Sequence, residues 1–262
     1  MLRSQKHWPK LHLINRREVN FDVPLARASC VNVTQILIMG RKILLSVVWV
    51  AFVAYTLLLA PLEQPGTLTL VEKLVTLHWA DINPFVITLF SLMGVWPLVY
   101  ACLMFIDSRM QHISAWPSFL ASNGSGVIGM IPYLLLREPS QEFSGKKGIC
   151  LKILDSRIMG VCLSLITVGL LAYAMLTGDW ADFVAQWHTN RFIYLMSLDF
   201  SLLYLVFPSL LGDDMARRGL RDSRIFWAVA LVPLVGAIAY LCLRPPIPES
   251  NTDLSSASCW FV

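Results

Sequence analysis

The sequence predicts an all-α protein, a polytopic bundle of transmembrane helices, on three observations. The chain contains six apolar stretches that are each about long enough to cross a bilayer. Of its 262 residues, 56% are hydrophobic and only 15% are charged, whereas soluble domains carry about 25% charged residues. Tryptophans lie near the ends of apolar stretches, as at Trp79, Trp116 and Trp180, where amphipathic rings favour the level of the lipid headgroups.

Each apolar stretch is interpreted as one helical span. At a rise of about 1.5 Å per residue, about 20 residues cross a hydrocarbon core that is about 30 Å thick. Because lipid offers no hydrogen bonds, such segments must be helices that satisfy their own backbone groups. In order, the six predicted spans are Ile43–Ala60, Asn83–Ile106, Pro117–Leu136, Ile158–Thr177, Phe192–Leu211 and Ile225–Leu243.

Polar segments flank the transmembrane domain, which we place at residues 39–246. Residues 1–38 form a basic, non-membrane segment that accounts for the net charge of +4. Met39 is followed by Gly-Arg-Lys and then a span, which is typical of the start of a bacterial membrane protein. We therefore interpret residues 1–38 as upstream sequence read in frame, with a disordered basic tail or a transit peptide as the alternatives. Residues 247–262 are predicted to be a polar C-terminal tail.

Two segments of the chain resemble one another. Gly129–Pro139 aligns without gaps on Gly236–Pro246. This likeness predicts two half-repeats, 41–139 and 157–246, of three spans each. Since three is odd, the second copy would insert upside down, which is the architecture of many secondary transporters. The identical pairs include Tyr133 with Tyr240, Arg137 with Arg244, and Pro139 with Pro246.

The alternative to duplication is that both segments are simply good span ends. An interfacial tyrosine, a cation near the C-terminal end of the helix dipole and a terminating proline would each be favourable there. On this interpretation Arg137 and Arg244 are structural helix-end residues. Asp107 and Arg109 play the same part where the second span ends.

Loop charge is the sequence's test of orientation, because loops rich in lysine and arginine stay on the cytoplasmic side. With six spans and a start at Met39, the loops after spans one, three and five hold most of the cations. Both termini would then lie outside. If residues 1–38 belong to the protein, their cations balance the two sides and the rule gives no orientation.

Asp199 is the leading candidate for a functional residue. It lies about eight residues into the fifth span, where a charged aspartate costs roughly 2.5–3.5 kcal/mol to insert. It could handle a proton, a cation or a ligand, or it could form a buried hydrogen bond that holds helices together. Asn123, in the small and polar segment 122–126 of span three, is a candidate partner through a direct hydrogen bond. Tyr133 and Tyr240 are further intramembrane polar candidates.

The sequence contains no recognisable catalytic or metal-binding set. The spans carry no His-x-x-x-His, no Glu-x-x-His and no pair of carboxylates one helical turn apart. We therefore predict no catalytic residue, no metal and no cofactor, and favour a non-enzymatic protein. Histidines at 78, 112 and 188 leave ligation of heme or a pigment as an alternative. From Met39 onward basic and acidic residues balance, so no nucleic-acid partner is expected.

From Met39 to Pro246 the chain resembles an uncharacterised six-span integral membrane protein family of cyanobacteria and plastids, for which no activity is known. The resemblance implies a cyanobacterial plasma membrane or a thylakoid membrane. It is carried by the segments Ile82-Asn-Pro84, Phe90-Ser-Leu-Met-Gly-Val-Trp-Pro97, Pro132-Tyr-Leu-Leu-Leu-Arg-Glu-Pro139, Met196-Ser-Leu-Asp-Phe200 and Tyr240-Leu-Cys-Leu-Arg-Pro-Pro246.

These observations favour an accessory or assembly component of a photosynthetic membrane complex. Its expected partners are the lipid bilayer and other membrane protein subunits. The alternative is a transporter of a small solute or ion with a midplane polar site around Asp199. That alternative predicts a cavity between the third and fifth spans.

Overall fold

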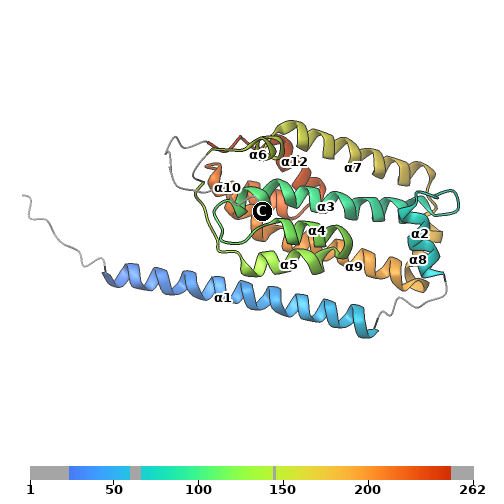
Figure 1. Cartoon of the computed structure of the whole chain (residues 1–262), viewed down its shortest axis with the longest axis horizontal. Helices are drawn as coiled ribbons and strands as arrows, with labels where there is room; N and C mark the ends of the chain where they lie inside the picture. The colour runs from blue at the N-terminus through green and yellow to red at the C-terminus, as the bar shows by residue number, and fades with distance from the viewer. Residues whose placement is uncertain (1–23, 60–65, 144–145, 249–262) are drawn as a thin grey trace, which may run out of the picture. The chain divides into compact units, whose positions relative to one another are not determined.

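The computed structural model describes residues 24–59, 66–143 and 146–248, within which all regular structure is helical. The predicted all-α class is thus confirmed. The chain divides into two compact units, residues 1–41 and 42–262, and the described part of the first is the beginning of α1. Figure 1 labels most of the helices along the chain. Their bounds are as follows: α1 Pro24–Ala54, a π-helical turn Tyr55–Leu59, α2 Thr67–Val75, α3 Pro84–Ser108, α4 Trp116–Ser125, α5 Val127–Leu136, α6 Ile149–Leu154, α7 Arg157–Thr177, α8 Trp180–Thr189, α9 Arg191–Val206, α10 Pro208–Arg217, α11 Ser223–Ala230 and α12 Val235–Leu243.

Four stretches of described helix are long and apolar enough to cross a membrane. They are Gln35–Leu58, Pro84–Ser108, Arg157–Thr177 and Arg191–Arg217, which correspond to predicted spans one, two, four and five. The membrane class of the chain therefore rests on helix length and composition. The predicted N-terminal segment lies outside the described residues as far as residue 23. Residues 24–38 are helical and form the beginning of α1.

Predicted span three is not one helix, which corrects the six-span expectation. It is divided at Gly126, whose φ of 56° is left-handed, into α4 and α5 of ten residues each. Ten residues reach only about 15 Å, half of the hydrocarbon core. A Cβ built on Gly129 would lie 2.5 Å from the Ser122 backbone nitrogen, although residues seven apart in one helix are separated by about 10 Å. The chain therefore reverses at Gly126, and we call α4–α5 the first hairpin (Figure 1).

Predicted span six is divided in the same way. Helix α11 ends at Ala230 and α12 begins at Val235, and between them Leu234 has a φ of 55°. A Cβ built on Gly236 would overlap the Val229 carbonyl oxygen, again seven residues back along the chain. Helices α11 and α12 are therefore a second hairpin, which packs back on itself as the first does.

Both hairpins enter and leave at the same end of the bundle. Arg137, which follows α5, is hydrogen-bonded to Asp107 at the end of α3. Arg244, which follows α12, is likewise bonded to Asp214 near the end of α10. The two flanks of each hairpin are thus held together, and neither hairpin crosses the bundle.

Helices α3 and α9–α10 run in the same direction. At one end Val86 clusters with Ile193; midway the Tyr100 hydroxyl donates to the Leu203 carbonyl oxygen at 2.6 Å. At the other end Asp107 accepts a hydrogen bond from Arg217. Helix α3 precedes the first hairpin and α10 precedes the second, and both helices run towards the end of the bundle where the hairpins begin. An inverted repeat would make α3 and α9–α10 antiparallel, so the expected upside-down arrangement of the halves is not confirmed.

Matching caps begin the two parallel helices. The Asn83 side chain accepts from the Phe85 N–H at 3.0 Å at the start of α3. The Asn190 side chain accepts from the Phe192 N–H at 3.0 Å at the start of α9. Asparagine is favoured at this position because its side-chain oxygen satisfies a backbone donor that the helix cannot.

Candidate functional site

A cavity of about 730 Å³ lies within the second unit and contains Asp199. Its walls come from α1, α2, α3, the tip of the first hairpin and α9. Most of the wall is apolar, and one group of polar side chains lies around the hairpin tip. The aromatic lining residues are Phe52, Trp79, Phe90 and Phe192, and the polar ones are Thr56, Ser91, Ser122, Asn123, Ser125 and Asp199.

The Asp199 carboxylate forms a hydrogen bond with the backbone at the turn of the first hairpin. Its Oδ1 accepts the backbone N–H of Val127, the first residue of α5, at 2.8 Å. That N–H has no partner within its own helix, and a helix N-terminus favours negative charge. Asp199, at 5% exposure, therefore caps a helix from a different part of the chain and holds α9 against the hairpin.

The second oxygen of the same carboxylate differs from the first in its hydrogen bonding. Asp199 Oδ2 is buried and has no hydrogen-bond partner among the described residues. Buried polar atoms are usually satisfied, and an exception calls for an explanation. The half-satisfied carboxylate in the wall of the cavity is therefore the strongest indication of a ligand site.

Gly126 is needed for this arrangement for two reasons. Its φ of 56° is disfavoured for residues with a side chain. A Cβ at this position would also overlap Asp199 Oδ2. The carboxylate can approach the helix break only because residue 126 has no side chain.

Asn123 lines the same cavity but does not bond to Asp199. Its amide donates to the Phe119 carbonyl oxygen at 2.7 Å, one turn back in α4. The predicted hydrogen bond between Asn123 and Asp199 is therefore wrong, because the broken helix lets Val127 take that position. The structure nevertheless brings both residues to one cavity.

Tyr133 belongs to a different cluster, at the end of the bundle where α3 terminates. Its hydroxyl donates to Asp107 Oδ2 at 2.7 Å, and Arg137 donates to both oxygens of Asp107 at 2.8 Å. We call Asp107, Tyr133 and Arg137 the first triad. Arg217 also donates to Asp107, and Arg137 to Asp213.

Tyr240 lies in an equivalent second triad with Asp214 and Arg244. The Tyr240 hydroxyl donates to Asp214 Oδ2 at 2.6 Å, and Arg244 donates to the same oxygen at 3.2 Å. Arg218 adds two further bonds, at 2.8 and 3.1 Å. The second triad thus places the same three residue types around one carboxylate as the first.

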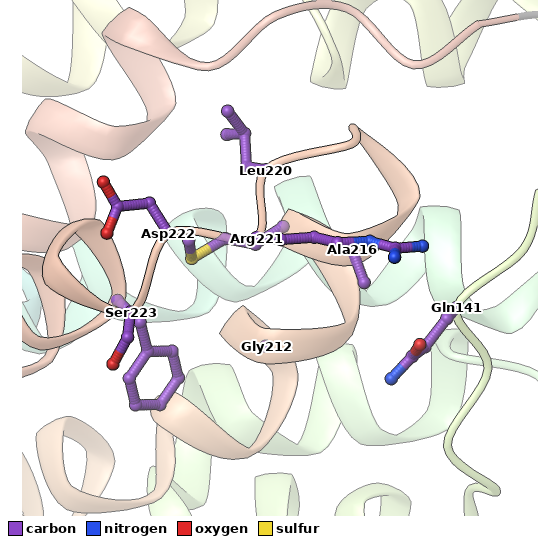
Figure 2. A pocket seen from close by; sticks show the side chains of 9 residues that line it. Gln141, Gly212, Ala216, Leu220, Arg221, Asp222 and Ser223 are labelled. Atoms are coloured by element: carbon purple, nitrogen blue, oxygen red, sulfur yellow. The ribbon is translucent and has the colours of Figure 1, made fainter.

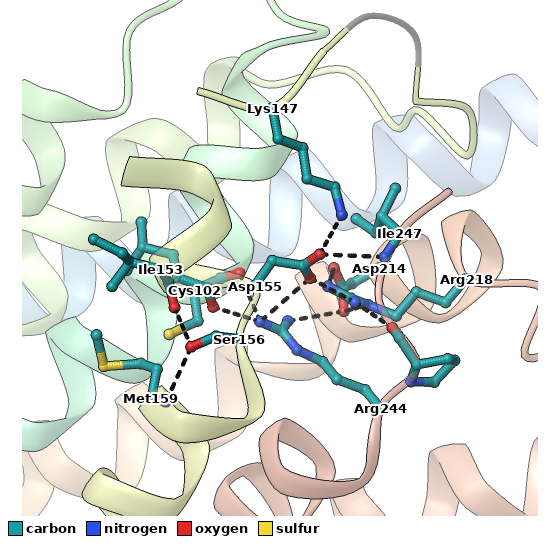
Figure 3. A network of polar contacts seen from close by, with 12 residues as sticks. Cys102, Lys147, Ile153, Asp155, Ser156, Met159, Asp214, Arg218, Arg244 and Ile247 are labelled. Carbon is teal, nitrogen blue, oxygen red and sulfur yellow. Dashed lines mark hydrogen bonds and ion pairs between the residues drawn. The ribbon is translucent and has the colours of Figure 1, made fainter. Parts of the chain in front are cut away.

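Figure 3 shows how Asp155 extends the second triad towards the loop before α7. Arg218 pairs with Asp155 Oδ1 at 2.7 Å, and Lys147 with Asp155 Oδ2 at 2.5 Å. The backbone N–H of Ile247 also donates to this carboxylate, at 3.2 Å. Asp155 therefore connects three separate segments at this end of the bundle.

Two arginines at this end, Arg137 and Arg218, are held in their charged form. Burial alone would lower the pKa of Arg137, but the hydrogen bond and negative charge of Asp107, with that of Asp213, raise the pKa above its usual range. Burial alone would likewise lower the pKa of Arg218, but the negative charges of Asp214 and Asp155 raise it. Because these arginine charges are compensated by carboxylates, we assign the triads a structural role. Tyr133 and Tyr240 lie outside the lining of the Asp199 cavity.

Of the expected helix-end residues, Arg137, Arg244 and Asp107 take part in the triads, whereas Arg109 is exposed at the C-cap of α3 and lies outside both triads. Sequence reasoning did not assign Asp214 or Asp155. A signal existed for Asp214: aspartate and tyrosine are 26 residues apart in each triad, and aspartate and arginine 30.

A second cavity of about 400 Å³ lies beside the turn between α10 and α11 (Figure 2). Its polar lining residues in the described part of the chain, Gln141, Arg221, Asp222 and Ser223, are all exposed. Since none of them needs a ligand to satisfy it, we assign no site there.

Fold and site together define a helical protein of the membrane-spanning class with a partly polar internal cavity. Comparison of the chain with protein-family models, with curated proteins and with solved structures finds no match. Within the described residues, no group of three or more His, Cys, Asp or Glu side chains could hold a metal ion.

Proposed function

We propose that this protein is a membrane carrier that binds a small solute in the Asp199 cavity. The observation that carries the proposal is the buried Asp199 Oδ2 atom, which lacks a hydrogen-bond partner among the described residues. The accessory role in a photosynthetic membrane complex, and the cyanobacterial or thylakoid membrane, stay predictions. The cavity favours the carrier hypothesis, because that hypothesis predicts a cavity between the third and fifth apolar segments.

The helix break supports a binding role. Irregular backbone at membrane depth is tolerated where it is buried in protein or lines a cavity. The break at Gly126 meets both conditions, since Gly126 is buried and lines the Asp199 cavity. Carriers commonly build their sites from interrupted helices of this kind.

The size of the cavity also supports a small ligand. Its volume of about 730 Å³ lies within the range of about 300–1,000 Å³ that is typical of small-molecule sites. Such sites are mostly apolar with a few placed polar groups. The apolar walls and the polar hairpin tip have this composition.

We further propose that the two halves of the chain are a duplication with parallel orientation. The equal spacings within the two triads, the matching Asn83 and Asn190 caps and the two hairpins support it. Parallel repeats related by an axis along the membrane normal occur in transporters. A carrier of this kind would rock one half against the other, so that the site between them is exposed to each side of the membrane in turn.

Accessibility from both sides of a membrane tests the carrier. Asn123→Cys, in a cysteine-free background, places a thiol in the cavity at an exposed position. In proteoliposomes, a membrane-impermeant thiol reagent is supplied either outside or inside the vesicles, with orientation established separately. A carrier presents its site alternately to both sides, so we expect labelling from each.

The matched control is Leu205→Cys, at an exposed apolar position of α9. Lipid should shield this thiol from the charged reagent on both sides. Labelling of Asn123→Cys from one side only, or from neither, would overturn the carrier proposal.

A further inference from the structure

We infer that the solute of the Asp199 cavity is a monovalent organic cation, an ammonium group on an apolar body. This inference rests on the proposed function and names the chemistry of its ligand. It is drawn from the charges, hydrogen bonds and wall composition of the cavity.

The charge of the cavity is uncompensated. Among its lining residues Asp199 is the charged one, and lysine, arginine and histidine are absent from that lining. The Val127 N–H satisfies Oδ1 alone, and within the described part of the chain no donor reaches Oδ2. An ionised carboxylate at membrane depth is unfavourable unless it is paired. An ammonium group supplies both the opposite charge and the missing donor.

An anionic solute does not fit this site. The attractive feature for an anion would be the N-terminus of α5, where backbone N–H groups and the helix dipole concentrate positive charge. Asp199 already occupies that position through its bond to Val127. A second negative group would meet the carboxylate and be repelled.

A bare metal ion fits poorly as well. Calcium takes 6–8 oxygen ligands and magnesium demands an octahedral set. Within the described residues no cluster of three or more metal-ligating side chains occurs, and the walls around the one carboxylate are largely apolar. Hydrated divalent cations would therefore lose more solvation than this site restores.

The aromatic walls suit an organic cation. Phe52, Phe90 and Phe192 line the cavity together with Trp79. Aromatic faces attract cations within about 6 Å and also accept apolar groups. The Trp79 Nε1 donates to the Leu74 carbonyl oxygen at 3.2 Å, which fixes its ring. A ligand with a cationic head and an apolar body would use both kinds of wall.

The test compares phenethylammonium with 2-phenylethanol, a neutral molecule of nearly the same shape. Binding of each to the full chain in lipid nanodiscs is measured by titration calorimetry. We expect the ammonium ion to bind at least tenfold more tightly than the alcohol. Equal binding of the two, or displacement of the ammonium ion by sodium or potassium at matched ionic strength, would overturn the inference.

The decisive variant is Asp199→Asn. Asparagine keeps an oxygen that can accept the Val127 N–H, but removes the negative charge. We expect ammonium binding to weaken at least tenfold while binding of the alcohol stays the same, which also excludes partition into lipid as the signal. Unchanged ammonium binding in this variant would refute the assignment.

If Asn123→Cys is labelled from both sides but no ammonium binding is found, only the cation inference fails. If labelling fails while the ammonium ion binds in an Asp199-dependent manner, the carrier fails and a cation-binding site remains. The comparison of the two ligands needs only the unmodified chain, so it decides the inference even if Asp199→Asn does not fold.

Discussion

The Asp199 carboxylate accepts the backbone N–H of Val127 at 2.8 Å, across 72 residues of sequence. One hydrogen bond therefore connects a helix that is long and apolar enough to span a membrane to the tip of the first hairpin. The other oxygen of this carboxylate, in the wall of a cavity, has no hydrogen-bond partner among the described residues. Structural and binding roles thus fall on different atoms of one side chain.

Two substitutions separate these roles by their effect on stability. We expect Asp199→Ala to lower the free energy of unfolding by about 1 kcal/mol, the usual loss for a removed helix cap. Asp199→Asn should retain most of the stability because its amide oxygen can still accept from Val127. Thermal unfolding of the detergent-solubilised variants measures both. Equal destabilisation by the two variants would show that charge, not the cap, holds the hairpin.

Gly126→Ala should destabilise the first hairpin. A side chain in left-handed backbone costs about 1–2 kcal/mol, and the added Cβ would also displace Asp199. The matched control is Gly124→Ala, because a Cβ there meets nothing within 4 Å and alanine favours helix over glycine. Thermal unfolding should show a loss for Gly126→Ala and none for Gly124→Ala. Similar melting of the two variants would contradict the sharp turn at residue 126.

Removal of one partner from the first triad should be strongly destabilising. Arg137→Gln leaves Asp107 buried with less compensation, and breaking a buried pair typically costs about 3–5 kcal/mol. Arg109→Gln, at an exposed position two residues beyond Asp107, should change stability by less than about 0.5 kcal/mol. Expression level and thermal unfolding of the two variants provide the comparison. Two equally mild variants would mean that the triad contributes little.

The hairpins change the predicted topology. Because each hairpin enters and leaves at one end of the bundle, the loops that contain His112 and Glu142 lie at the same end, whereas six spans would place them on opposite sides of a membrane. Most cations of the loops share that side, against Lys73 and Arg191 at the opposite end. By the positive-inside rule, we expect this end to face the cytoplasm.

Cysteines introduced at residues 112, 142 and 78 test that topology in intact cells. An impermeant thiol reagent should label the His78 variant and leave the other two unmodified until the membrane is opened. Labelling of residue 142 but not 112 would restore the six-span arrangement.

Several features could be predicted from the amino-acid sequence alone, because they depend on local composition. Helix α3 is apolar on all sides and opens with Asn-Pro, so its class and its start follow from residues 83–108 alone. Asp199 could also be identified from local sequence, because a carboxylate within an apolar stretch is costly wherever it faces. Its hydrogen-bond partner Val127 could not be predicted in this way, because Val127 contributes a backbone N–H that almost any residue carries.

The sequence by itself determined that this is a helical membrane protein, since hydropathy and segment length depend only on the order of residues. Only the tertiary structure decided which apolar segments are single long helices and which are hairpins. A segment of 20 apolar residues has the same composition as a straight span or as a hairpin, and the contacts that select the hairpin join residues far apart. The Asp107–Arg137 and Asp214–Arg244 pairs hold the two ends of each hairpin together. They thereby determine the end of the bundle from which the chain continues after each hairpin.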